Sequence, residues 1–436
     1  MLIFLQMRKF IGMKRKKIVI IGGGFAGLNL ARKLAKADCE IILVDKQNHH
    51  MFQPLFYQVA SARLEPSSIS FPFRAIFRRR PNVEFRYATV ERVRTEDNVI
   101  ETSMGEIAYD ELVIATGCRT NFFGNQELEK YTMAMKSTQQ TIHIRNTILT
   151  KFEKIMFVDN KQEQEELMNL VIVGAGPTGV ELSGAFVEMK TKVLPKDYPH
   201  YDFSQLKIIL LEGSPNTLNA MSEKSRMWSR RYLEKMGVEV RTSTVVSGYD
   251  GHKLTLQTGE IIPTQTVIWA AGVQGNVIPG LEKAEIVRAR YTVDRHSLVK
   301  GYNNVYAIGD ISYMETEKYP QGHPQLANVA INQGRMLALN FRAKWSGRSL
   351  QNFEYKDKGT MATVGKHKAV VELPNFKFQG YFAWIVWMAL HLMLILSVRN
   401  KIAVFFNWAW RYITGDTSLR LILRDEADRD VMRRND

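Results

Sequence analysis

The chain contains very little cysteine: Cys39 and Cys118 are the only two among 436 residues. Two thiols far apart in the sequence cannot build a disulfide scaffold, a structural zinc site or an iron–sulfur cluster, which needs about four thiolates. We expect both cysteines to be small packing residues in the core. Sparse cysteine also favours a cytoplasmic protein.

The chain lacks any sequence typical of proteins that read DNA or RNA, although its formal net charge is +15. Its basic residues are scattered, with short runs at 14–17 and 78–80. An excess of positive charge favours anionic partners such as nucleic acid, anionic lipid or an anionic cofactor. Because no nucleic-acid motif accompanies the charge, we expect lipid and cofactors as partners and no nucleic acid.

A secretion signal is also missing, because the apolar run MLIFLQM precedes the first charges and no small-residue cleavage site follows. We take residues 1–13 as an N-terminal extension of little structural consequence, with Met13 as an alternative start. The remaining chain, 45% hydrophobic and 24% charged overall, has the composition of a folded protein. Its length predicts two or three domains.

What the sequence does contain is a near-repeat of one glycine-rich pattern. KIVIIGGGFAGL at 17–28 and LVIVGAGPTGVEL at 170–182 each join a β-branched strand to a glycine turn and a helix. Buried strands that end in small residues follow at 110–117, 266–272 and 304–310. Strands that alternate with helices favour parallel sheets covered on both faces.

The sequence therefore predicts an α/β protein with two Rossmann-like dinucleotide-binding domains and a C-terminal membrane-anchoring region. We expect the first domain at 14–125 and 290–345, the second at 126–289, and the C-terminal region at 346–436.

The first glycine turn has the G-x-G-x-x-G spacing of a dinucleotide site, with Gly22, Gly24 and Gly27. The first glycine makes the turn, the second lets a pyrophosphate approach the backbone, and the third lets helix pack on strand. Asp45 ends the strand IILVD and is expected to bind a ribose hydroxyl. The site is completed by neighbours of these residues: Phe25, Ala26 and Lys46.

The second turn repeats this spacing with Gly174, Gly176 and Gly179. Its acid is Glu212, which lies further along than the usual ~20 residues, so we expect an insertion around 191–201. A glutamate here accepts from a 2′-hydroxyl and repels a 2′-phosphate, which favours NAD over NADP. Two later arginines would soften this preference: Arg230 and Arg231.

Two dinucleotide sites in one chain usually hold one flavin and one nicotinamide dinucleotide, with hydride passing between them. Asp310 in the AIGD motif would then reach the ribityl or phosphate part of the flavin, or it would cap the following helix. A flavin disulfide reductase needs two close cysteines, and an internal electron carrier needs ligands that this sequence lacks. A reduced flavin must therefore pass its electrons to an external acceptor.

The order of motifs resembles that of the type II NADH:quinone oxidoreductases. GGGFAGL, NHHMFQPLFYQVA, ATG, GAGPTGVELSG, AAG, AIGD and ANVAINQG follow one another over nearly the whole chain. The resemblance implies a monomeric or homodimeric enzyme with non-covalent FAD that oxidises NADH and reduces a membrane quinone of the respiratory chain without pumping protons. It further implies a peripheral position on the cytoplasmic face of a bacterial-type cell membrane.

Several residue roles follow from this resemblance. Thr116 and Gly117 match later FAD contacts, and Gly272 belongs to the AAG motif of the NADH domain. Glu181 matches a glutamate near nicotinamide and quinone, and quinone reduction consumes two protons that a carboxylate could relay. The other interpretation of Glu181 is a first-turn glutamate that complements the helix dipole. The segment at 48–60 is expected to line the flavin, with His49 and His50 as polar packing residues.

The segment ANVAINQG at 327–334 resembles the family's quinone-site motif but departs from it, because asparagine occupies both glutamine positions. An asparagine amide is one methylene shorter and would reach a quinone carbonyl from a different depth. In the other interpretation, small residues of this helix only pack against the flavin ring. The predicted quinone site comprises five residues: Ala327, Asn328, Ala330, Asn332 and Gln333.

The stretch YFAWIVWMALHLMLILSV at 381–398 holds 18 residues without a charge, with His391 near its middle. As one helix it would be about 27 Å long, close to the ~30 Å hydrocarbon core of a bilayer. Three interpretations stay open: a spanning helix, docking on one leaflet, and a buried core helix. The aromatic stretch at 402–413 is too short to span, which favours docking through the C-terminal region.

Three other functions remain possible on the sequence. The first is a flavin reductase that acts on a soluble acceptor. The second is a sulfide:quinone reductase, which needs catalytic cysteines near the flavin. The third is a membrane-tethered NAD(H)-sensing protein with structural FAD.

Overall fold

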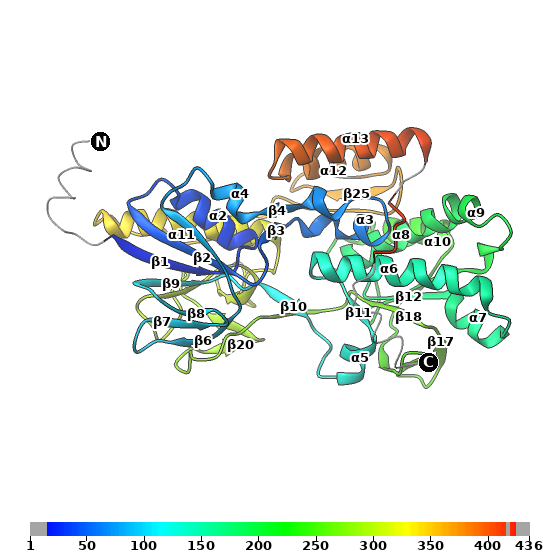
Figure 1. Ribbon diagram of the computed structural model, residues 1–436, viewed down its shortest axis with the longest axis horizontal. Helices are drawn as coiled ribbons and strands as arrows, with labels where there is room; N and C mark the ends of the chain where they lie inside the picture. The colour runs from blue at the N-terminus through cyan, green and yellow to red at the C-terminus, as the bar shows by residue number, and fades with distance from the viewer. Residues whose placement is uncertain (1–14, 416–418, 424–436) are drawn as a thin grey trace. The chain divides into compact units, whose positions relative to one another are not determined.

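The computed structural model describes residues 15–415 and 419–423 (Figure 1). The predicted extension at 1–13 lies outside these residues. The chain divides into two compact units, which are described separately. Unit 1 takes the described residues of Met1–His50, Phe71–Arg119 and Val273–Lys356, and unit 2 takes those of Met51–Ser70, Thr120–Gly272 and Asp357–Asp436. The C-terminal region that we expected from 346 therefore falls in unit 2 from Asp357 onward.

Unit 1 is built on a five-stranded sheet in the order β22-β9-β1-β2-β5, in which every neighbouring pair is parallel. These strands are short, rich in valine and isoleucine and buried, as a sheet with both faces covered requires. A three-stranded antiparallel sheet, β6-β7-β8, follows β5 in the chain. Helix α11 packs along α2.

The elements of unit 1, with three short strands at its boundaries (β3, β4 and β10), run as follows: β1 (Lys16–Ile21), α2 (Phe25–Leu34), β2 (Cys39–Asp45), β3 (His49–Met51), β4 (Ser70–Pro72), α4 (Phe73–Phe77), β5 (Val83–Tyr87), β6 (Val90–Arg94), β7 (Val99–Thr102), β8 (Gly105–Ala108), β9 (Glu111–Ile114), β10 (Cys118–Thr120), β19 (Val273–Gly275), β20 (Ile286–Val287), β21 (Arg290–Thr292), β22 (Val305–Ala307), η5 (Gly309–Ile311), β23 (Ser312–Tyr313) and α11 (Ala327–Trp345).

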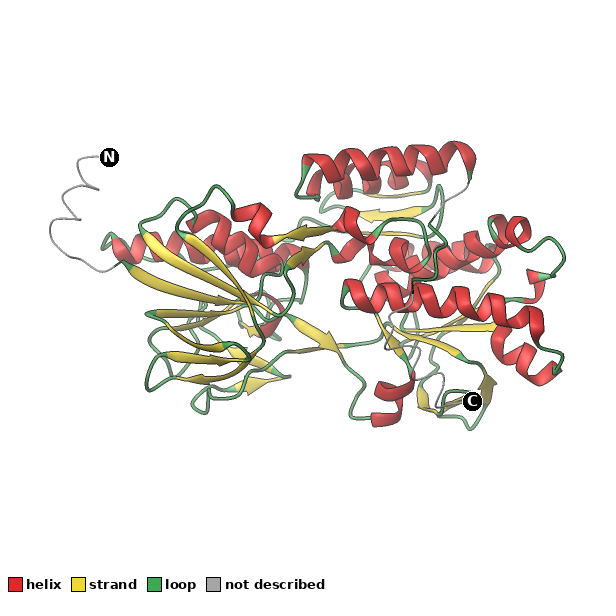
Figure 2. Cartoon of the chain, in the orientation of Figure 1, coloured by secondary structure: helices red, strands yellow, loops and turns green. Residues whose placement is uncertain are grey.

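Unit 2 repeats this architecture. Its five-stranded parallel sheet has the order β11-β18-β12-β13-β14, with β12 in the place of β1 and β13 in the place of β2. A three-stranded antiparallel sheet, β15-β16-β17, again follows the last parallel strand. The near-repeat in the sequence thus predicts the fold class correctly: two Rossmann-like units in which strands alternate with helices (Figure 2).

The elements of unit 2 run as follows: η1 (Gln53–Leu55), α3 (Phe56–Ala60), η2 (Pro66–Ile69), α5 (Gln126–Tyr131), β11 (Met133–Ala134), α6 (Thr138–Lys154), η3 (Ile155–Phe157), α7 (Lys161–Met168), β12 (Asn169–Val173), α8 (Pro177–Lys192), α9 (Leu194–Asp197), η4 (Phe203–Gln205), β13 (Lys207–Leu211), α10 (Glu223–Lys235), β14 (Val238–Arg241), β15 (Val246–Tyr249), β16 (Lys253–Leu256), β17 (Ile261–Pro263), β18 (Thr266–Trp269), β24 (Thr360–Thr363), β25 (Ala369–Glu372), β26 (Lys377–Gln379), α12 (Tyr381–Leu394) and α13 (Val398–Thr414). The predicted insertion around 191–201 corresponds to the end of α8 and to α9.

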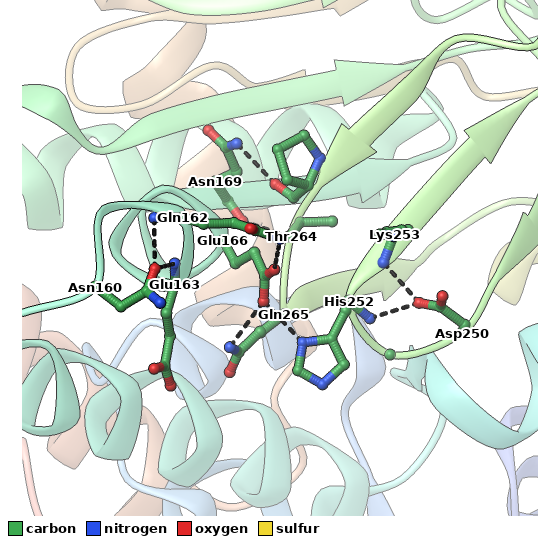
Figure 3. A network of polar contacts seen from close by, with 12 residues as sticks. Asn160, Gln162, Glu163, Glu166, Asn169, Asp250, His252, Lys253, Thr264 and Gln265 are labelled. Atoms are coloured by element: carbon green, nitrogen blue, oxygen red, sulfur yellow. Dashed lines mark hydrogen bonds and ion pairs between the residues drawn. The ribbon is translucent and has the colours of Figure 1, made fainter. Parts of the chain in front are cut away.

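A network of polar side chains fastens the start of β12 in unit 2 (Figure 3). Glu166 accepts hydrogen bonds from His252 Nδ1 at 2.7 Å and from Gln265 Nε2 at 3.1 Å. The amide of Asn169 donates to the carbonyl of Pro263, and the hydroxyl of Thr264 donates to the carbonyl of Asn169. Because ligands of parallel sheets bind at the carboxyl ends of the strands, this network at the amino end of β12 has a structural role.

The apolar stretch at 381–398 is not one helix. Helix α12 ends at Leu394, Ile395 is extended, and α13 begins at Val398 (Figure 1). At 1.5 Å per residue the 14 residues of α12 reach only about 21 Å. None of the helices in the described parts of the chain is long and apolar enough to cross a membrane.

Both helices instead bury one stripe in unit 2 at a spacing of four residues. In α12 this stripe is Ala383, Trp387 and His391, and α13 likewise buries Asn400, Val404 and Trp408.

Candidate functional site

The glycine turn of unit 1 follows β1 and opens α2. Gly22 has a φ of +103°, and a Cβ at Gly27 would lie 1.9 Å from the carbonyl oxygen of Gly22, so only glycine fits at either position. A Cβ at Gly24, the N-cap of α2, would meet no atom within 4 Å. Since no residue of 15–415 or 419–423 fills that space, a phosphate would fit there at the helix N-terminus.

Asp45 at the end of β2 is tied to the same turn. Its carboxylate accepts from the backbone N–H of Gly23 at 2.6 Å and from that of Gln47 at 2.7 Å. Burial raises the pKa of Asp45, and these two hydrogen bonds oppose the shift. Lys46 follows on the surface, and Phe25 contacts the ring of His50 edge-on at 5.2 Å between centroids.

His50 is a packing residue, as the sequence predicts. Its Nδ1 lies 2.9 Å from the carbonyl of Gly23, and burial lowers its pKa to about 4, so the ring is neutral at pH 7. No group of His, Cys, Asp and Glu within 15–415 and 419–423 is arranged to hold a metal ion.

Two further turns meet this site at the carboxyl edge of the unit 1 sheet. After β9, Thr116 and Gly117 are held by Asn276, whose amide donates to the carbonyl of Thr116 at 3.0 Å. The hydroxyl of Thr116 donates to the carbonyl of Asn276 in return. After β22, Asp310 accepts from the thiol of Cys118 at 3.0 Å. Asn276 escaped the sequence prediction because it belongs to no glycine or acid pattern.

Helix α11 packs on the first turn through small residues. A Cβ at Gly334 would lie 2.4 Å from the carbonyl oxygen of Ala26, so the two helices approach closely only because position 334 is glycine. A Cβ on Gly309 would lie 3.5 Å from that of Ala330, which places Ala330 against the AIGD turn.

Gln333, which we predicted for the quinone site, has hydrogen-bond partners within unit 1. Its side chain is 1% exposed, and its amide oxygen accepts from the N–H of Gly309 at 2.6 Å and from Ser312. It therefore fixes α11 to the AIGD turn. Of the other predicted residues, Asn328 is exposed, and Ala327 and Asn332 are half-buried.

The glycine turn of unit 2 has the same geometry at its three glycines and at its acid. Gly174 has a φ of +103°, a Cβ at Gly179 would lie 1.9 Å from the carbonyl of Gly174, and a Cβ at Gly176 would meet nothing within 4 Å. Glu212 at the end of β13 accepts from the N–H of Ala175 at 2.6 Å and from that of Ser214 at 2.8 Å. Gly272 follows β18 with a φ of +70°.

Glu181 lies on α8, beyond its first turn, with its side chain buried. Its carboxyl group accepts from the backbone N–H of Thr363 on β24 at 3.3 Å. Burial raises the pKa of Glu181 to about 8, although the contacts with Thr363 and Trp387 oppose the shift. The carboxyl group is therefore protonated at pH 7, and a neutral side chain does not complement a helix dipole.

A pocket of about 50 Å³ in unit 2 is lined by Thr363, the residue whose backbone N–H donates to this carboxyl group. Thr363 and Trp387 line it, and so do Tyr57 and Gln58 from α3. Hydrogen bonds join its wall: Gln58 donates to the hydroxyl of Tyr57 at 3.0 Å, and the indole of Trp408 donates to the amide oxygen of Gln58 at 2.8 Å. Helices α12 and α13 thus close a pocket that is aromatic on one side and polar on the other.

The sequence did not predict that these residues form a pocket. Tyr57 and Gln58 belong to the segment 48–60 that we expected to line the flavin, and the sequence offers no separate signal for Thr363. His391, which would be costly in lipid, faces the protein: its ring stacks on Trp387 at 3.9 Å between centroids, and burial lowers its pKa to about 4.

Comparisons with known proteins agree with this geometry. Residues 16–334 match the pyridine nucleotide-disulphide oxidoreductase family, and residues 358–416 match the NDH2 C-terminal domain. A solved NDH2 structure from Plasmodium falciparum, in complex with NADH, superposes with a TM-score of 0.87 at 20% identity and covers 94% of this chain and 100% of that chain.

Curated relatives are closer in sequence. The type II NADH:quinone oxidoreductase NdhA of Mycobacterium tuberculosis is 34% identical over 90% of this chain and 86% of its own length. The type II NADH:quinone oxidoreductase Ndh of the same organism is 31% identical over 92% of this chain and 89% of its own length. The chain therefore belongs to the type II NADH:quinone oxidoreductase family.

Proposed function

We propose that this protein oxidises NADH by hydride transfer to non-covalently bound FAD and then reduces a membrane quinone by two electrons, without pumping protons. The observation that carries the proposal is the protonated Glu181 beside the aromatic pocket of unit 2, in a chain with two complete dinucleotide turns. Membership of the family supports the same conclusion.

The residues of unit 1 fit FAD. The space beyond Gly24 would take the pyrophosphate, Asp45 would accept from a ribose hydroxyl, and Asp310 would meet the ribityl chain. FAD, when bound, supplies the redox chemistry, because it can accept a hydride and pass on two electrons. The protein supplies the binding, the orientation and the exclusion of water.

The residues of unit 2 fit NADH. The space beyond Gly176 would take the pyrophosphate at the N-terminus of α8, and Glu212 would bind the adenosine ribose. A glutamate at this position disfavours the 2′-phosphate of NADPH. Hydride transfer requires the nicotinamide held by unit 2 to reach the flavin held by unit 1.

In this proposal the unit 2 pocket admits the quinone. The aromatic side of the pocket would contact the ring and the tail of the quinone. Protonated Glu181, which lies next to Thr363 in the pocket wall, would donate a proton to the reduced quinone. Asn328, which is exposed, and Asn332, which is half-buried, stay candidates for contact with the quinone carbonyls.

Helices α12 and α13 would dock the protein on one leaflet of a bilayer. Their free faces expose Phe382, Met393, Phe405, Phe406 and Ile413, each at least 53% exposed. Such an amphipathic pair lies in the plane of the interface. We place the enzyme on the cytoplasmic face of the cell membrane, as a monomer or homodimer.

A comparison of acceptors tests this function. NADH oxidation is measured with a soluble quinone analogue and with a small hydrophilic acceptor such as ferricyanide. The substitution Trp384→Ala in the pocket wall should raise the KM for the quinone and leave the rate with ferricyanide unchanged. The control Trp345→Ala, at the end of α11, should alter neither. If Trp384→Ala slows NADH oxidation equally with both acceptors, the quinone does not bind in this pocket.

A further inference from the structure

An exposed aromatic side chain lies on the glycine turn that follows β18 in unit 2. Phe123 is 69% exposed, and a Cβ at Gly272 would lie 2.9 Å from the Cζ atom of its ring. The backbone of the same turn contacts the first glycine of the dinucleotide turn, because a Cβ at Gly174 would lie 2.8 Å from the Cα of Ala271. The ring of Phe123 is therefore next to a turn that itself borders the expected NADH site.

Hydrogen bonds of Asn121 hold Phe123 in this position. The backbone N–H of Phe123 donates to the side-chain oxygen of Asn121 at 2.8 Å. The indole of Trp269 on β18 donates to the backbone carbonyl of Asn121 at 3.0 Å, and the N–H of Asn121 donates to the carbonyl of Gly272 at 3.4 Å. The segment 121–123 is thus attached to the end of β18 through its backbone, and burial of the phenylalanine ring is not needed to hold it there.

Phe123 combines two unfavourable features. Its φ of +53° lies in the left-handed region, where a residue with a Cβ is strained. Its ring also stays largely in water, where it forgoes the free energy of burial. Backbone strain of this kind gathers at ligand sites, where the position of a side chain matters more than its stability. Packing on Gly272 accounts for only the covered part of the residue.

The order of the strands tells which half of NADH the ring would meet. In the unit 2 sheet β12 lies between β13 and β18, so the strand order reverses on the β18 side of β12. A dinucleotide lies across the carboxyl edge of the sheet at such a reversal, with its pyrophosphate at the helix N-terminus. Glu212 at the end of β13 would bind the adenosine ribose. The nicotinamide half would then lie over the end of β18, where Gly272 and Phe123 are.

We propose that Phe123 is a binding residue for the nicotinamide riboside half of NADH, which its exposed ring contacts. This inference rests on the NADH site proposed for unit 2 and adds the side chain that recognises one half of the substrate. A phenylalanine ring suits a flat heterocycle, because aromatic rings gain energy from offset stacking or edge-to-face contact. The contact contributes to binding, and no proton or electron passes through the ring.

Titration calorimetry on the FAD-loaded full chain tests the proposal with NAD⁺ and ADP. NAD⁺ does not reduce the flavin, and ADP shares the adenosine and the pyrophosphate but lacks the nicotinamide riboside. Phe123→Ala should weaken NAD⁺ binding about tenfold, which corresponds to about 1.4 kcal/mol, and leave ADP binding unchanged. Phe123→Tyr keeps the ring and should bind both ligands as the wild type does.

The matched control is Phe157→Ala, which removes another exposed ring of unit 2. Phe157 is 87% exposed at the end of η3, before the helix that leads to the amino end of β12, and its loss should change neither ligand. Melting temperature and flavin content should stay at their wild-type values in every variant, because both rings are exposed. If Phe123→Ala does not fold, Phe123→Leu keeps an apolar contact with Gly272 and should still weaken NAD⁺ binding alone.

The other outcomes overturn the inference in distinguishable ways. If the wild type binds both ligands and Phe123→Ala binds NAD⁺ equally well, the ring does not contact the nicotinamide half, and the proposed function stands. Equal weakening of NAD⁺ and ADP would mean that the ring only supports the turn, and loss of FAD would mean that it serves the flavin. If the wild type binds neither ligand, the NADH site proposed for unit 2 is wrong, and this inference fails with it.

Discussion

The carboxyl group of Glu181 accepts a hydrogen bond from the backbone N–H of Thr363, which joins α8 to strand β24 of unit 2. Thr363 also lines the pocket that α12 and α13 close, and its hydroxyl donates to Tyr57 at 3.3 Å. The proposed proton donor is therefore held by the part of the chain that would bind the membrane. Its protonation has measurable consequences for stability and for turnover.

The first prediction concerns stability. The pKa of Glu181 is about 8 in the folded protein against 4.5 ordinarily, so between these values the unfolded chain loses a proton that the folded protein keeps. Stability due to this group is full below pH 4.5 and is lost as pH rises to about 8. Glu181→Gln does not titrate and should be more stable above pH 8, by up to ~5 kcal/mol. Thermal melts of both proteins from pH 4 to 9 check this, and a constant difference would contradict it.

The second prediction concerns turnover. Below pH 8 the neutral carboxyl group can donate a proton to the quinone, and above it the ionised group cannot. Quinone reduction should therefore slow as pH rises through about 8. In Glu181→Gln it should be about a hundredfold slower and independent of pH in this range, because an amide donates no catalytic proton. Rapid mixing separates this step from flavin reduction by NADH, which should keep its wild-type rate.

The third prediction is that Gly176 is needed for NADH binding and Gly179 for folding of unit 2. Gly176→Ala adds a Cβ that meets no protein atom, so the protein should fold and bind FAD, with an NADH KM raised at least tenfold. Gly179→Ala places a Cβ 1.9 Å from the carbonyl of Gly174 and should unfold unit 2 or prevent its expression. Melting curves, flavin content and NADH kinetics distinguish the two outcomes. If the KM for NADH is unchanged in Gly176→Ala, the pyrophosphate of NADH does not bind at this turn.

The fourth prediction concerns docking. Phe405 and Phe406 on α13 are 53% and 64% exposed, and burial of a phenylalanine in lipid contributes about 1.5–3 kcal/mol. Phe405→Ser with Phe406→Ser should therefore weaken binding to lipid vesicles by at least a hundredfold in a flotation assay. The control Phe157→Ser removes a side chain that is 87% exposed but lies outside α12 and α13, and it should bind as before. Equal loss in the control would exclude α13 as the docking face.

The sequence predicted the two dinucleotide turns because glycine spacing has a local cause. Gly27 and Gly179 are required by a close approach to backbone within their own turns, and Asp45 and Glu212 end the strand that follows. The pocket of unit 2 could not be predicted in this way. Tyr57, Thr363 and Trp408 come from three distant segments, and each looks like an ordinary core residue in the sequence.

The structure of the apolar stretch at 381–398 likewise depends on contacts that a local pattern does not reveal. Its composition allowed a spanning helix, and the break at Ile395 with the buried stripe of Trp387 and His391 decides against one continuous helix. That break depends on packing against α3 and β25, which no local pattern reveals. The hydrogen bond between Gln333 and Gly309 could not be predicted for a similar reason, since the two residues lie 24 positions apart.

The central claim is tested most directly by the absorption spectrum of the purified protein under anaerobic conditions. Addition of NADH should bleach the visible absorption bands of the oxidised flavin, and a quinone analogue added next should restore them. Persistence of the bands after NADH would contradict the hydride step. Bleaching that a quinone fails to reverse, while ferricyanide reverses it, would contradict the assignment of quinone as the acceptor.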